Sequence, residues 1–364
     1  MNRRVRVGVV GFGLVGKRHA QTIVAEPSTQ LAAVADPTDC RNEVRSMDAA
    51  YFASLDELID SQSIEGIVLA TPTPLHLDQA RRCIEAGIPI LIEKPIATSA
   101  QEAVSIVDLA AARNVPVMVG HHRRFNGVIR EAKRIIERGE IGKVRAITST
   151  CWLYKPDQYF EEATWRTKKG AGPISVNLVH DIDLLRHFCG EVHRVQATSK
   201  PSLRGYENED VAAAILNFQS GTVATVAVSD AIASPWSWEL TARENPVYHA
   251  TDQTCYQIGG SEGALSIPDL KLWRHEARPD WWSPIQSESR YVEATDPLIE
   301  QARHFADVIR GKDIPLVSAL EGTRSLQVVE AIQNSANSGL PVDLAPVEIS
   351  DAVSAKEQRI DGVA

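Results

Sequence analysis

The stretch Gly11-Phe12-Gly13-Leu14-Val15-Gly16 has glycines at its first, third and sixth positions, which is the spacing of a dinucleotide-binding loop. In such a loop the first glycine permits a tight turn, the second lets the backbone approach a pyrophosphate, and the third lets helix and strand pack closely. The following helix presents free N–H groups to the phosphates. The sequence therefore predicts that these six residues bind a dinucleotide.

Asp36 lies twenty residues after Gly16, at the end of the second predicted strand. A carboxylate at this place can accept hydrogen bonds from the adenosine ribose and would repel a 2′-phosphate, so NAD is favoured over NADP. The alternative is that Asp36 only caps the loop before Pro37.

Lys94 follows the fifth predicted strand, within Glu93-Lys94-Pro95. Ligands of open α/β sheets lie at the carboxyl ends of the strands, so Lys94 is expected where a nicotinamide and a substrate would meet. A desolvated lysine there can exchange protons or stabilise a developing alkoxide. Pro95 is expected to make a cis or otherwise rigid turn. The alternative for a lone lysine at a strand end is a solvated charge.

His180 has the ordinary pKa best suited to proton exchange near neutral pH. Oxidation of an alcohol needs a base for the O–H proton while the hydride leaves for nicotinamide, and His180 is the candidate base. Asn177 lies three residues earlier and is expected on the same helical face, with Asp183 one turn on as a group that could orient the ring. The alternative is a packed histidine at a helix start.

Four cationic or titratable residues, His121 to Arg124, follow the sixth predicted strand. Arginine binds carboxylates in a bidentate manner, which would suit an acidic substrate. A salt-bridge cluster between two domains explains the segment equally well. Trp152, Tyr154 and Tyr159 either stack on the face of a sugar or ring, or pack at a domain interface.

Helices and strands must position these candidate residues. In the first 120 residues, short apolar runs alternate with helical patterns. The predicted strands cover 5–10, 31–35, 49–52, 64–70, 88–92 and 115–120, and the predicted helices 16–25, 54–61, 74–86 and 99–113. This alternation indicates a doubly wound parallel sheet, and Val, Ile and Leu dominate the strands because helices cover both faces.

After residue 120 the pattern changes to longer strands with a few separate helices, which is typical of an α+β domain with a mainly antiparallel sheet. The predicted helices are 126–138, 177–188, 297–310 and 319–338, and the predicted strands 143–153, 192–199, 210–218, 222–229, 238–242, 255–259 and 270–275. The predicted domains are 1–122 and 123–344, followed by a polar tail over 345–364.

Composition limits the function classes. The 364 residues carry a net charge of −9, which disfavours a nucleic-acid partner because phosphate binding favours a basic surface. Five cysteines without a C-x-x-C pair argue against a zinc site or a disulfide framework, and we expect no bound metal and a reducing, cytoplasmic setting. No apolar run reaches 18 residues, so we expect no membrane span.

The glycine loop, the element Glu93-Lys94-Pro95 and the segment 170–183 leading to His180 together resemble the Gfo/Idh/MocA oxidoreductase family over residues 5–343. The resemblance implies a Rossmann domain followed by a domain with a large open sheet. It also implies NAD(P)-dependent redox chemistry between an alcohol and a carbonyl, on a sugar, polyol, sugar acid or cyclic diol.

The resemblance also assigns roles to residues. It places Lys94 beside the reacting carbon and favours His180 as the base. The cofactor is expected to contact the glycine loop and Asp36 and, in addition, Thr71, Pro72, Thr73, His76, Glu93, Lys94, Arg124, Trp165 and Arg166. The substrate is expected to contact Arg123, Trp152, Tyr154, Asn177 and Asp181.

One position departs from the family. Many members carry an aspartate four residues before this histidine, where this chain has Val176 followed by Asn177. An amide cannot relay a proton, although it can bind a substrate hydroxyl. Proton transfer is therefore expected through Lys94 and His180 alone.

Two other functions fit parts of the sequence. Some relatives resemble NAD-dependent glycosidases, which recycle a tightly bound cofactor and form no net NADH. A non-catalytic NAD-binding protein is the third possibility, and the presence of Lys94 and His180 argues against it. In each case an open sheet in the second domain predicts a homodimer or homotetramer, because such a sheet tends to bury its outer face.

Overall fold

The computed structural model describes residues 3–350, and the chain divides into two compact units. The first unit comprises the chain up to His122, the segment Asp296–Leu326 and the residues from Pro346 onward. The second unit comprises Arg123–Thr295 and Gln327–Ala345. No helix among residues 3–350 is both long enough and apolar enough to cross a membrane.

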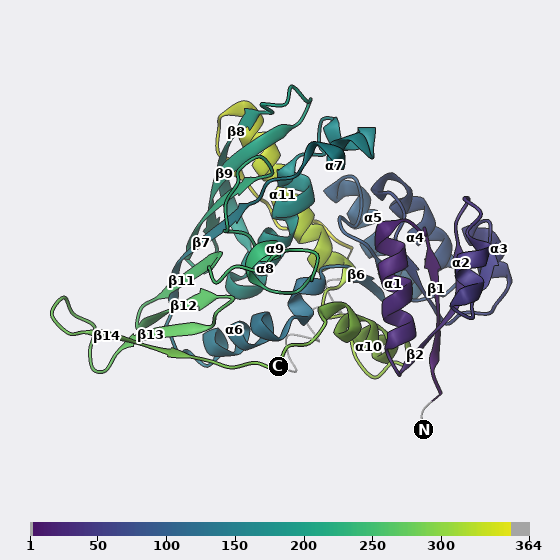
Figure 1. The fold of residues 1–364 in the computed structure, drawn as a ribbon, viewed down its shortest axis with the longest axis horizontal. Helices are drawn as coiled ribbons and strands as arrows, with labels where there is room; N and C mark the ends of the chain where they lie inside the picture. Colours follow the sequence, from purple (N-terminus) through teal and green to yellow (C-terminus); the bar gives the residue numbers. More distant parts are fainter. Residues whose placement is uncertain (1–2, 351–364) are drawn as a thin grey trace. The chain divides into compact units, whose positions relative to one another are not determined.

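The first unit contains a six-stranded parallel sheet in the order β3-β2-β1-β4-β5-β6 (Figure 1). Its strands are β1 Val5–Val10, β2 Thr29–Ala35, β3 Ala50–Phe52, β4 Gly66–Leu69, β5 Ile90–Ile92 and β6 Val117–Val119. The strand order reverses between β1 and β4, which is where ligands bind in doubly wound sheets. This sheet confirms the predicted parallel fold.

Helices alternate with these strands: α1 Leu14–Ala25, α2 Arg41–Ser46, α3 Leu55–Asp60, α4 His76–Glu85 and α5 Ala100–Arg113. Serine side chains cap two of them, since Ser54 accepts the N–H of Glu57 and Ser99 that of Glu102. Helix α10, Pro297–Ile309, returns to this unit and lies beside α1 (Figure 1). Its Phe305 is buried and lines a small internal cavity together with Val7 and Ile23.

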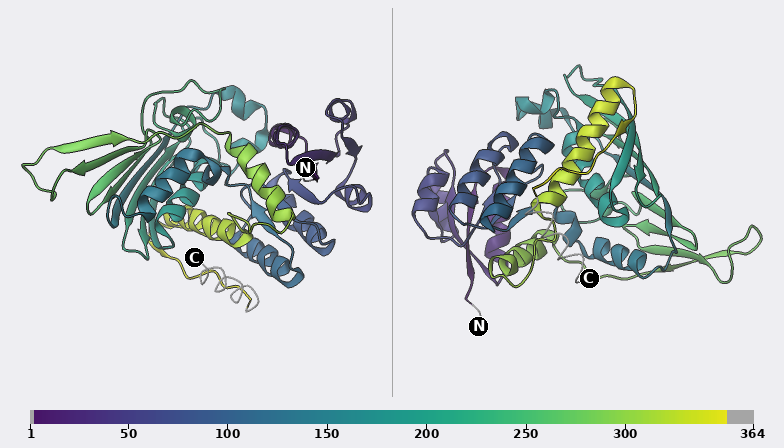
Figure 2. Two further views of the ribbon diagram at one scale, coloured as in Figure 1. Left: turned by 90° about the horizontal axis from the view of Figure 1, so that it is seen from below. Right: turned by 180° about the vertical axis from the view of Figure 1, so that it is seen from behind.

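The second unit contains a nine-stranded sheet in the order β14-β13-β12-β11-β7-β10-β9-β8-β15. Figure 2 shows the ribbon from two further sides. Its strands are β7 Val144–Trp152, β8 Val192–Pro201, β9 Glu209–Phe218, β10 Val223–Ser229, β11 Tyr256–Gly260, β12 Gly263–Ile267, β13 Lys271–His275, β14 Ile285–Ser289 and β15 Val342–Asp343. Only the pair β7–β10 is parallel among these neighbours; the others are antiparallel. The predicted mainly antiparallel sheet is therefore confirmed, and the turn at Ser220-Gly221 joins β9 to β10 as a hairpin.

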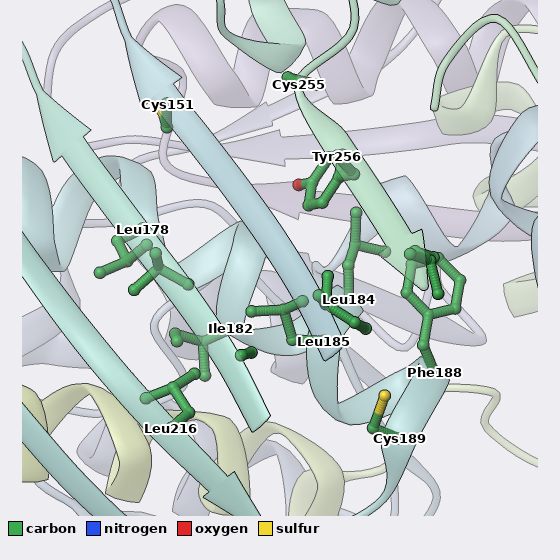
Figure 3. Close-up of a cluster of buried hydrophobic side chains, with 14 of the residues drawn as sticks. Cys151, Leu178, Ile182, Leu184, Leu185, Phe188, Cys189, Leu216, Cys255 and Tyr256 are labelled. Carbon is green, nitrogen blue, oxygen red and sulfur yellow. The ribbon is translucent and has the colours of Figure 1, made fainter. Parts of the chain in front are cut away.

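One face of this sheet is buried by helices. These are α6 Gly127–Glu137, α8 Val179–Cys189 and the part of α11, Ala319–Ser338, that belongs to the second unit. Figure 3 shows Ile182, Leu185 and Phe188 of α8 beside Leu216 and Tyr256 of the sheet. Alternate residues of β9 and β10 point to the other face and are exposed or half-exposed.

Residues 238–242 were predicted as a strand, and this prediction is wrong. Trp238–Thr241 forms a short helix, α9, because Ser237 accepts the N–H of Leu240 and caps its first turn. Sequence patterns also gave no indication of α2, of β12, of β14, or of the short helix α7, Asp157–Glu161. Each of these elements spans only four to six residues, which gives a periodic pattern few positions in which to repeat.

Two further differences concern helix α8 and the tail. A π-helix over Ile174–Leu178 precedes α8, so the predicted helix start at Asn177 lies inside a wider turn. In the predicted tail, Val347 and Ile349 pack against the core of the first unit, and residues 351–364 lie outside the described part of the chain.

Candidate active site

The glycine loop connects β1 to α1, and its glycines have different surroundings. Gly11 has φ +85°, and a Cβ there would lie 2.8 Å from the carbonyl oxygen of Ala70. A Cβ on Gly16 would collide with the carbonyl oxygen of Gly11. A Cβ on Gly13, the N-cap of α1, would meet no atom within 4 Å. The space in front of Gly13 is open, as an approaching pyrophosphate requires.

A pocket of about 620 Å³ adjoins this loop in the first unit. Its lining includes Phe12, Gly13, Asp36, Cys40 and Arg41. The Asp36 carboxylate accepts the backbone N–H of Phe12 at 2.6 Å and that of Thr38 at 2.8 Å. Asp36 therefore both caps its own loop and faces the pocket, so the two predicted roles are compatible.

Exposed apolar residues begin helix α1. Leu14 is 84% exposed and Val15 is 46% exposed, although both belong to the first turn of a helix whose inner face is buried. Such a turn can cover the cofactor without a rearrangement of the core.

The turn after β4 is stabilised by side-chain contacts. Thr71 donates its hydroxyl to Gln79 at 2.6 Å, and Pro72 and Thr73 lead into a 3₁₀ turn over Thr73–Leu75. The buried ring of His76 has one nitrogen 2.9 Å from the carbonyl oxygen of Thr71 and the other 3.0 Å from that of Pro95. Burial lowers the pKa of His76, and these two carbonyl oxygens oppose that effect. His76 therefore links the turn after β4 to the turn after β5.

The turn after β5 carries Lys94, and the Lys94–Pro95 peptide bond is cis, as one of the predicted geometries. The Glu93 side chain points to α1, where its Oε1 accepts a hydrogen bond from His19 Nε2 at 2.7 Å. Its Oε2 accepts the backbone N–H of Lys94 at 3.1 Å. Burial would raise the pKa of Glu93, but His19 and the nearby charges of Lys94 and His122 bring it down to about 2. The carboxylate is therefore ionised at neutral pH.

In the second unit, His180 is the second residue of α8 and is buried. Asn177 lies in the π-helix before it, where the three-residue spacing of an α-helix no longer sets which residues share a face. The Asn177 Oδ1 accepts a hydrogen bond from Lys155 Nζ at 2.7 Å, so the amide presents its NH₂ group elsewhere.

Lys155 was missed by the sequence analysis. It is 8% exposed, and its Nζ also lies 3.5 Å from Asp230 and 4.9 Å from the centre of the Tyr159 ring. Burial lowers the pKa of Lys155, and the charge of Asp230 opposes that effect. Its place just after a predicted strand was visible in the sequence, but its contact with Asn177 depends on how distant segments pack.

Arg123 and Asp181, both predicted to bind substrate, lie together in a buried network. Arg123 is 3.5 Å from Asp181 and 2.9 Å from Glu239, and Tyr256 donates its hydroxyl to Asp181. Burial raises the pKa of Asp181 to about 6, although Arg123 and Tyr256 favour its ionised form. The guanidinium of Arg123 is therefore already neutralised by carboxylates of its own unit.

Arg124 forms a second buried ion pair, with Nε and Nη2 donating to the two carboxylate oxygens of Asp183 at 2.8 and 2.7 Å. This bidentate pair is a salt bridge within the second unit, not the salt bridge between two domains that the sequence offered as the alternative. An acidic substrate thus draws no support from the charges of Arg123 and Arg124.

The predicted aromatic residues of the second unit differ in exposure. Tyr154 is 56% exposed and Trp165 is 57% exposed, whereas Trp152 is half-buried and packs edge-on against Trp236 with ring centres 5.9 Å apart. Arg166 stacks on Tyr159 at 4.0 Å and donates to its carbonyl oxygen at 2.5 Å. The geometry thus places the cofactor candidates of residues 11–94 in the first unit and the remaining candidates in the second.

Comparison with known protein families finds one match in the N-terminal part of the chain and a second in the part that follows. The model of the oxidoreductase family with an NAD-binding Rossmann fold, GFO_IDH_MocA, matches residues 5–121, and the model of the GFO/IDH/MocA C-terminal domain matches residues 129–266. Together the two matches cover most of the chain.

Similar proteins include two from Bacillus subtilis (strain 168). A scyllo-inositol 2-dehydrogenase (NAD(+)) is 28% identical over 360 residues, covering 94% of this chain and 97% of that protein. The scyllo-inositol 2-dehydrogenase (NADP(+)) IolW is 24% identical over 351 residues, covering 91% of this chain and 93% of that protein.

Among solved structures, the WlbA dehydrogenase from Bordetella pertussis, in complex with NADH and UDP-GlcNAcA, is 25% identical, with a TM-score of 0.75. The match covers 94% of this chain and 99% of that chain. From the two family matches, the glycine loop and the two sheets, it follows that the chain belongs to the Gfo/Idh/MocA family of NAD(P)-dependent oxidoreductases.

Proposed function

We propose that this protein is an NAD-dependent dehydrogenase that transfers a hydride between a secondary alcohol and nicotinamide. The observation that carries the proposal is the pocket beside the glycine loop, with the Asp36 carboxylate in its lining. An anion at this place favours a ribose with two free hydroxyls over one with a 2′-phosphate. The NADP-dependent relative shows that the family as a whole uses both cofactors.

The residues present fit such a cofactor. Gly13 leaves open space at the N-terminus of α1, and Leu14 and Val15 offer exposed apolar surface beside it. When bound, the nicotinamide would supply the hydride acceptor. Our other candidates for cofactor contact are the turn from Thr71 to His76 and the residues Glu93, Lys94, Arg124, Trp165 and Arg166.

The protein's own part in the reaction is proton transfer and positioning. Lys94 in the first unit stabilises the developing alkoxide, and His180 in the second unit accepts the proton of the reacting hydroxyl. Our candidates for substrate contact are Arg123, Trp152, Tyr154, Asn177 and Asp181. The contact with Lys155 supports this role for Asn177, because Lys155 Nζ occupies the Oδ1 of Asn177 and leaves the amide NH₂ to donate to a substrate oxygen.

For the substrate, we propose a sugar, polyol, sugar acid or cyclic diol. Two relatives are named for their action on scyllo-inositol, and a third was solved with UDP-GlcNAcA. All of these compounds carry rings with several adjacent oxygen substituents, which a set of polar donors such as Asn177 can bind.

We also propose that the exposed face of the nine-stranded sheet meets a second copy of the chain. Neighbouring strands align Gln196, Ile215, Thr225 and Thr148 across this face, and the next row aligns Thr198, Ala213, Ala227 and Thr150. These side chains are uncharged and mostly small, so two such faces could pack closely without burying unpaired charges.

The test is NADH formation, followed by its absorbance, at saturating NAD with a panel of polyols, aldoses, sugar acids and cyclic diols. We expect turnover with one class, and we expect Lys94→Ala to lose turnover while it still binds NAD. Wild-type kcat in Lys94→Ala would contradict the mechanism. No NADH across the panel, with NAD released from the denatured pure protein, would instead favour a hydrolase that recycles its cofactor.

A further inference from the structure

The Glu93 carboxylate joins two elements that the proposed mechanism treats separately. One oxygen binds His19, which lies on α1, the helix whose first turn follows the glycine loop. The other oxygen binds the backbone N–H of Lys94, in the turn after β5. A single carboxylate thus connects the phosphate-binding helix to the backbone of the lysine.

This carboxylate has little freedom to move. The side chains of His19 and Glu93 are 5% and 13% exposed. On another side lies Gly120, where a Cβ would be 2.9 Å from Glu93 Oε1 and 3.2 Å from Glu93 Cα. Gly120 therefore has no side chain at the place where the end of β6 comes closest to Glu93, and an alanine there would push against the carboxylate.

The remaining side of the turn is held by His76. Its ring contacts the carbonyl oxygen of Pro95, the residue after Lys94, at 3.0 Å. The backbone of Lys94 is thus fixed before and after the residue, by His19 acting through Glu93 and by His76 acting on Pro95. Two buried histidines serve this one turn.

We propose that His19 and Glu93 form a positioning pair that fixes the Lys94 turn relative to the N-terminus of α1, so that cofactor binding and lysine alignment are coupled. The effect on turnover rests on the proposed function, in which Lys94 acts at the reacting oxygen. Neither residue needs to touch cofactor or substrate for this role.

The test compares His19→Leu, which removes the donor to Glu93, with His19→Gln, whose amide can still donate. We expect His19→Leu to lower kcat about 10- to 100-fold, because small displacements of a catalytic group have effects of that size. The Kd for NAD should change much less, and His19→Gln should restore most of the wild-type kcat. Equal losses in both variants, or an unchanged kcat in His19→Leu, would overturn the proposal.

A matched control removes a different histidine–carboxylate pair of the same unit. His304 Nδ1 lies 3.3 Å from Asp313 near the end of α10. His304→Leu should leave kcat close to the wild-type value, and thermal unfolding of every variant should show that each is folded. A loss of kcat in His304→Leu as large as in His19→Leu would mean that general destabilisation, not positioning, causes the effect.

A second measurement does not depend on turnover. Acetic anhydride labels lysine amines, and mass spectrometry gives the rate at Lys94 relative to exposed Lys143. In Glu93→Gln this ratio should rise about twofold or more, because an amide has only one acceptor oxygen and cannot hold both His19 and the backbone N–H of Lys94, so the turn loosens. In His19→Leu it should differ from wild type, and in His19→Gln it should not.

The two measurements separate the two hypotheses. If the wild-type protein oxidises no compound of the panel, the proposed function fails, while an altered labelling ratio still supports the positioning pair. If the labelling ratio is the same in all variants, the positioning pair is overturned even where the dehydrogenase activity is found.

Discussion

At the residue scale, Asp36 stabilises its own loop and, in the proposed function, also selects the cofactor. Its oxygens accept the N–H groups of Phe12 and Thr38, which fixes the side chain at the edge of the pocket. A carboxylate held in this way can meet a ribose without first losing side-chain freedom. In the proposed function, the same contacts hold its negative charge where it would repel a 2′-phosphate.

Asp36→Ala should therefore change cofactor choice more than fold. We expect kcat/KM with NAD to fall about 10-fold, because hydrogen bonds to a charged group contribute about 1.5–3 kcal/mol. The value with NADP should rise or stay the same, since the repulsive charge is gone. Steady-state kinetics with both cofactors measures the ratio. Asp39→Ala, at an exposed carboxylate of the same pocket, is the control and should leave the ratio unchanged.

Asp181 gives a prediction for pH and stability. Burial raises its pKa from 3.8 to about 6 in the folded protein. The stabilisation that its protonated form provides is therefore fully present below pH 3.8 and is lost as the pH rises through about 6.

Urea unfolding at pH 4.5, 5.5 and 7 can test this on wild type and Asp181→Asn, whose amide does not ionise. The free energy of unfolding of the wild type, relative to the variant, should decrease across this interval. Parallel pH profiles of the two proteins would show that Asp181 does not titrate there.

Some of these residues were predictable from the sequence, and others were not. The glycine loop, Asp36 and Lys94 follow strands whose apolar runs are clear, so their places at one edge of the sheet follow from the topology. Lys155 and His19 act through contacts with Asn177 and Glu93, which lie 22 and 74 residues away. Contacts of that kind depend on packing and leave no local pattern.

At the element scale, two glycines of the glycine loop have different surroundings and are expected to be needed for different reasons. Gly16 is needed because the start of α1 touches the backbone of Gly11, whereas Gly13 has empty space before it. The first is a requirement of folding, and in the proposed function the second is a requirement of cofactor binding.

Alanine at each position should separate these requirements. Gly16→Ala should lower the free energy of unfolding by about 1–3 kcal/mol, since its Cβ overlaps a carbonyl oxygen and α1 must shift. Gly13→Ala should retain its stability but weaken NAD binding about 10-fold or more, because its methyl group would stand in the path of the pyrophosphate. Denaturant unfolding and isothermal titration calorimetry measure the two effects. The reverse assignment of the effects would contradict this account of the loop.

Element prediction worked where the local pattern was clear. The twenty-residue helix α11 has the predicted bounds because many of its residues repeat one period, and the six-residue strand β1 has them because its valine-rich run ends at the glycine loop. Trp238–Thr241 was misjudged because four apolar and polar residues fit either period, and the cap at Ser237 decides for a helix. The π-helix before α8 changes the side-chain register near His180, and the spacing of Asn177 and His180 alone gave no sign of it.

At the scale of the whole molecule, the nine-stranded sheet leaves one broad face without helices among the residues of the second unit that the structure describes (Figures 1 and 2). Ile215 is 45% exposed near the middle of this face. An exposed sheet face whose central rows carry no charge, with Arg194 and Lys200 only in the flanking rows, is typical of a surface that is covered in an oligomer.

Ile215→Lys should therefore convert a dimer or tetramer to a smaller species, because it would bury unpaired ammonium groups in the interface. Light scattering coupled to size-exclusion chromatography measures the mass. Leu203→Lys adds the same charge at a residue that is 93% exposed in the loop after β8, and it should leave the mass unchanged. A wild-type protein that is monomeric at all concentrations would refute the proposed interface.

Helix α10 belongs to the first unit, although the 173 residues of Arg123–Thr295 precede it in the chain. Its Phe305 and Ala302 cover Val7 and Ile23, and Gly66 has no side chain because Ile309 occupies that space. The core of this unit also includes Val317, Leu320 and Leu326, which follow α10. On the ribosome, the first 122 residues are therefore made long before the segment that completes their core. Until translation passes residue 326, the nucleotide-binding fold has an uncovered apolar surface. A nascent chain stalled before that point would be a natural substrate for chaperones that recognise apolar surface, and one stalled well beyond it would not.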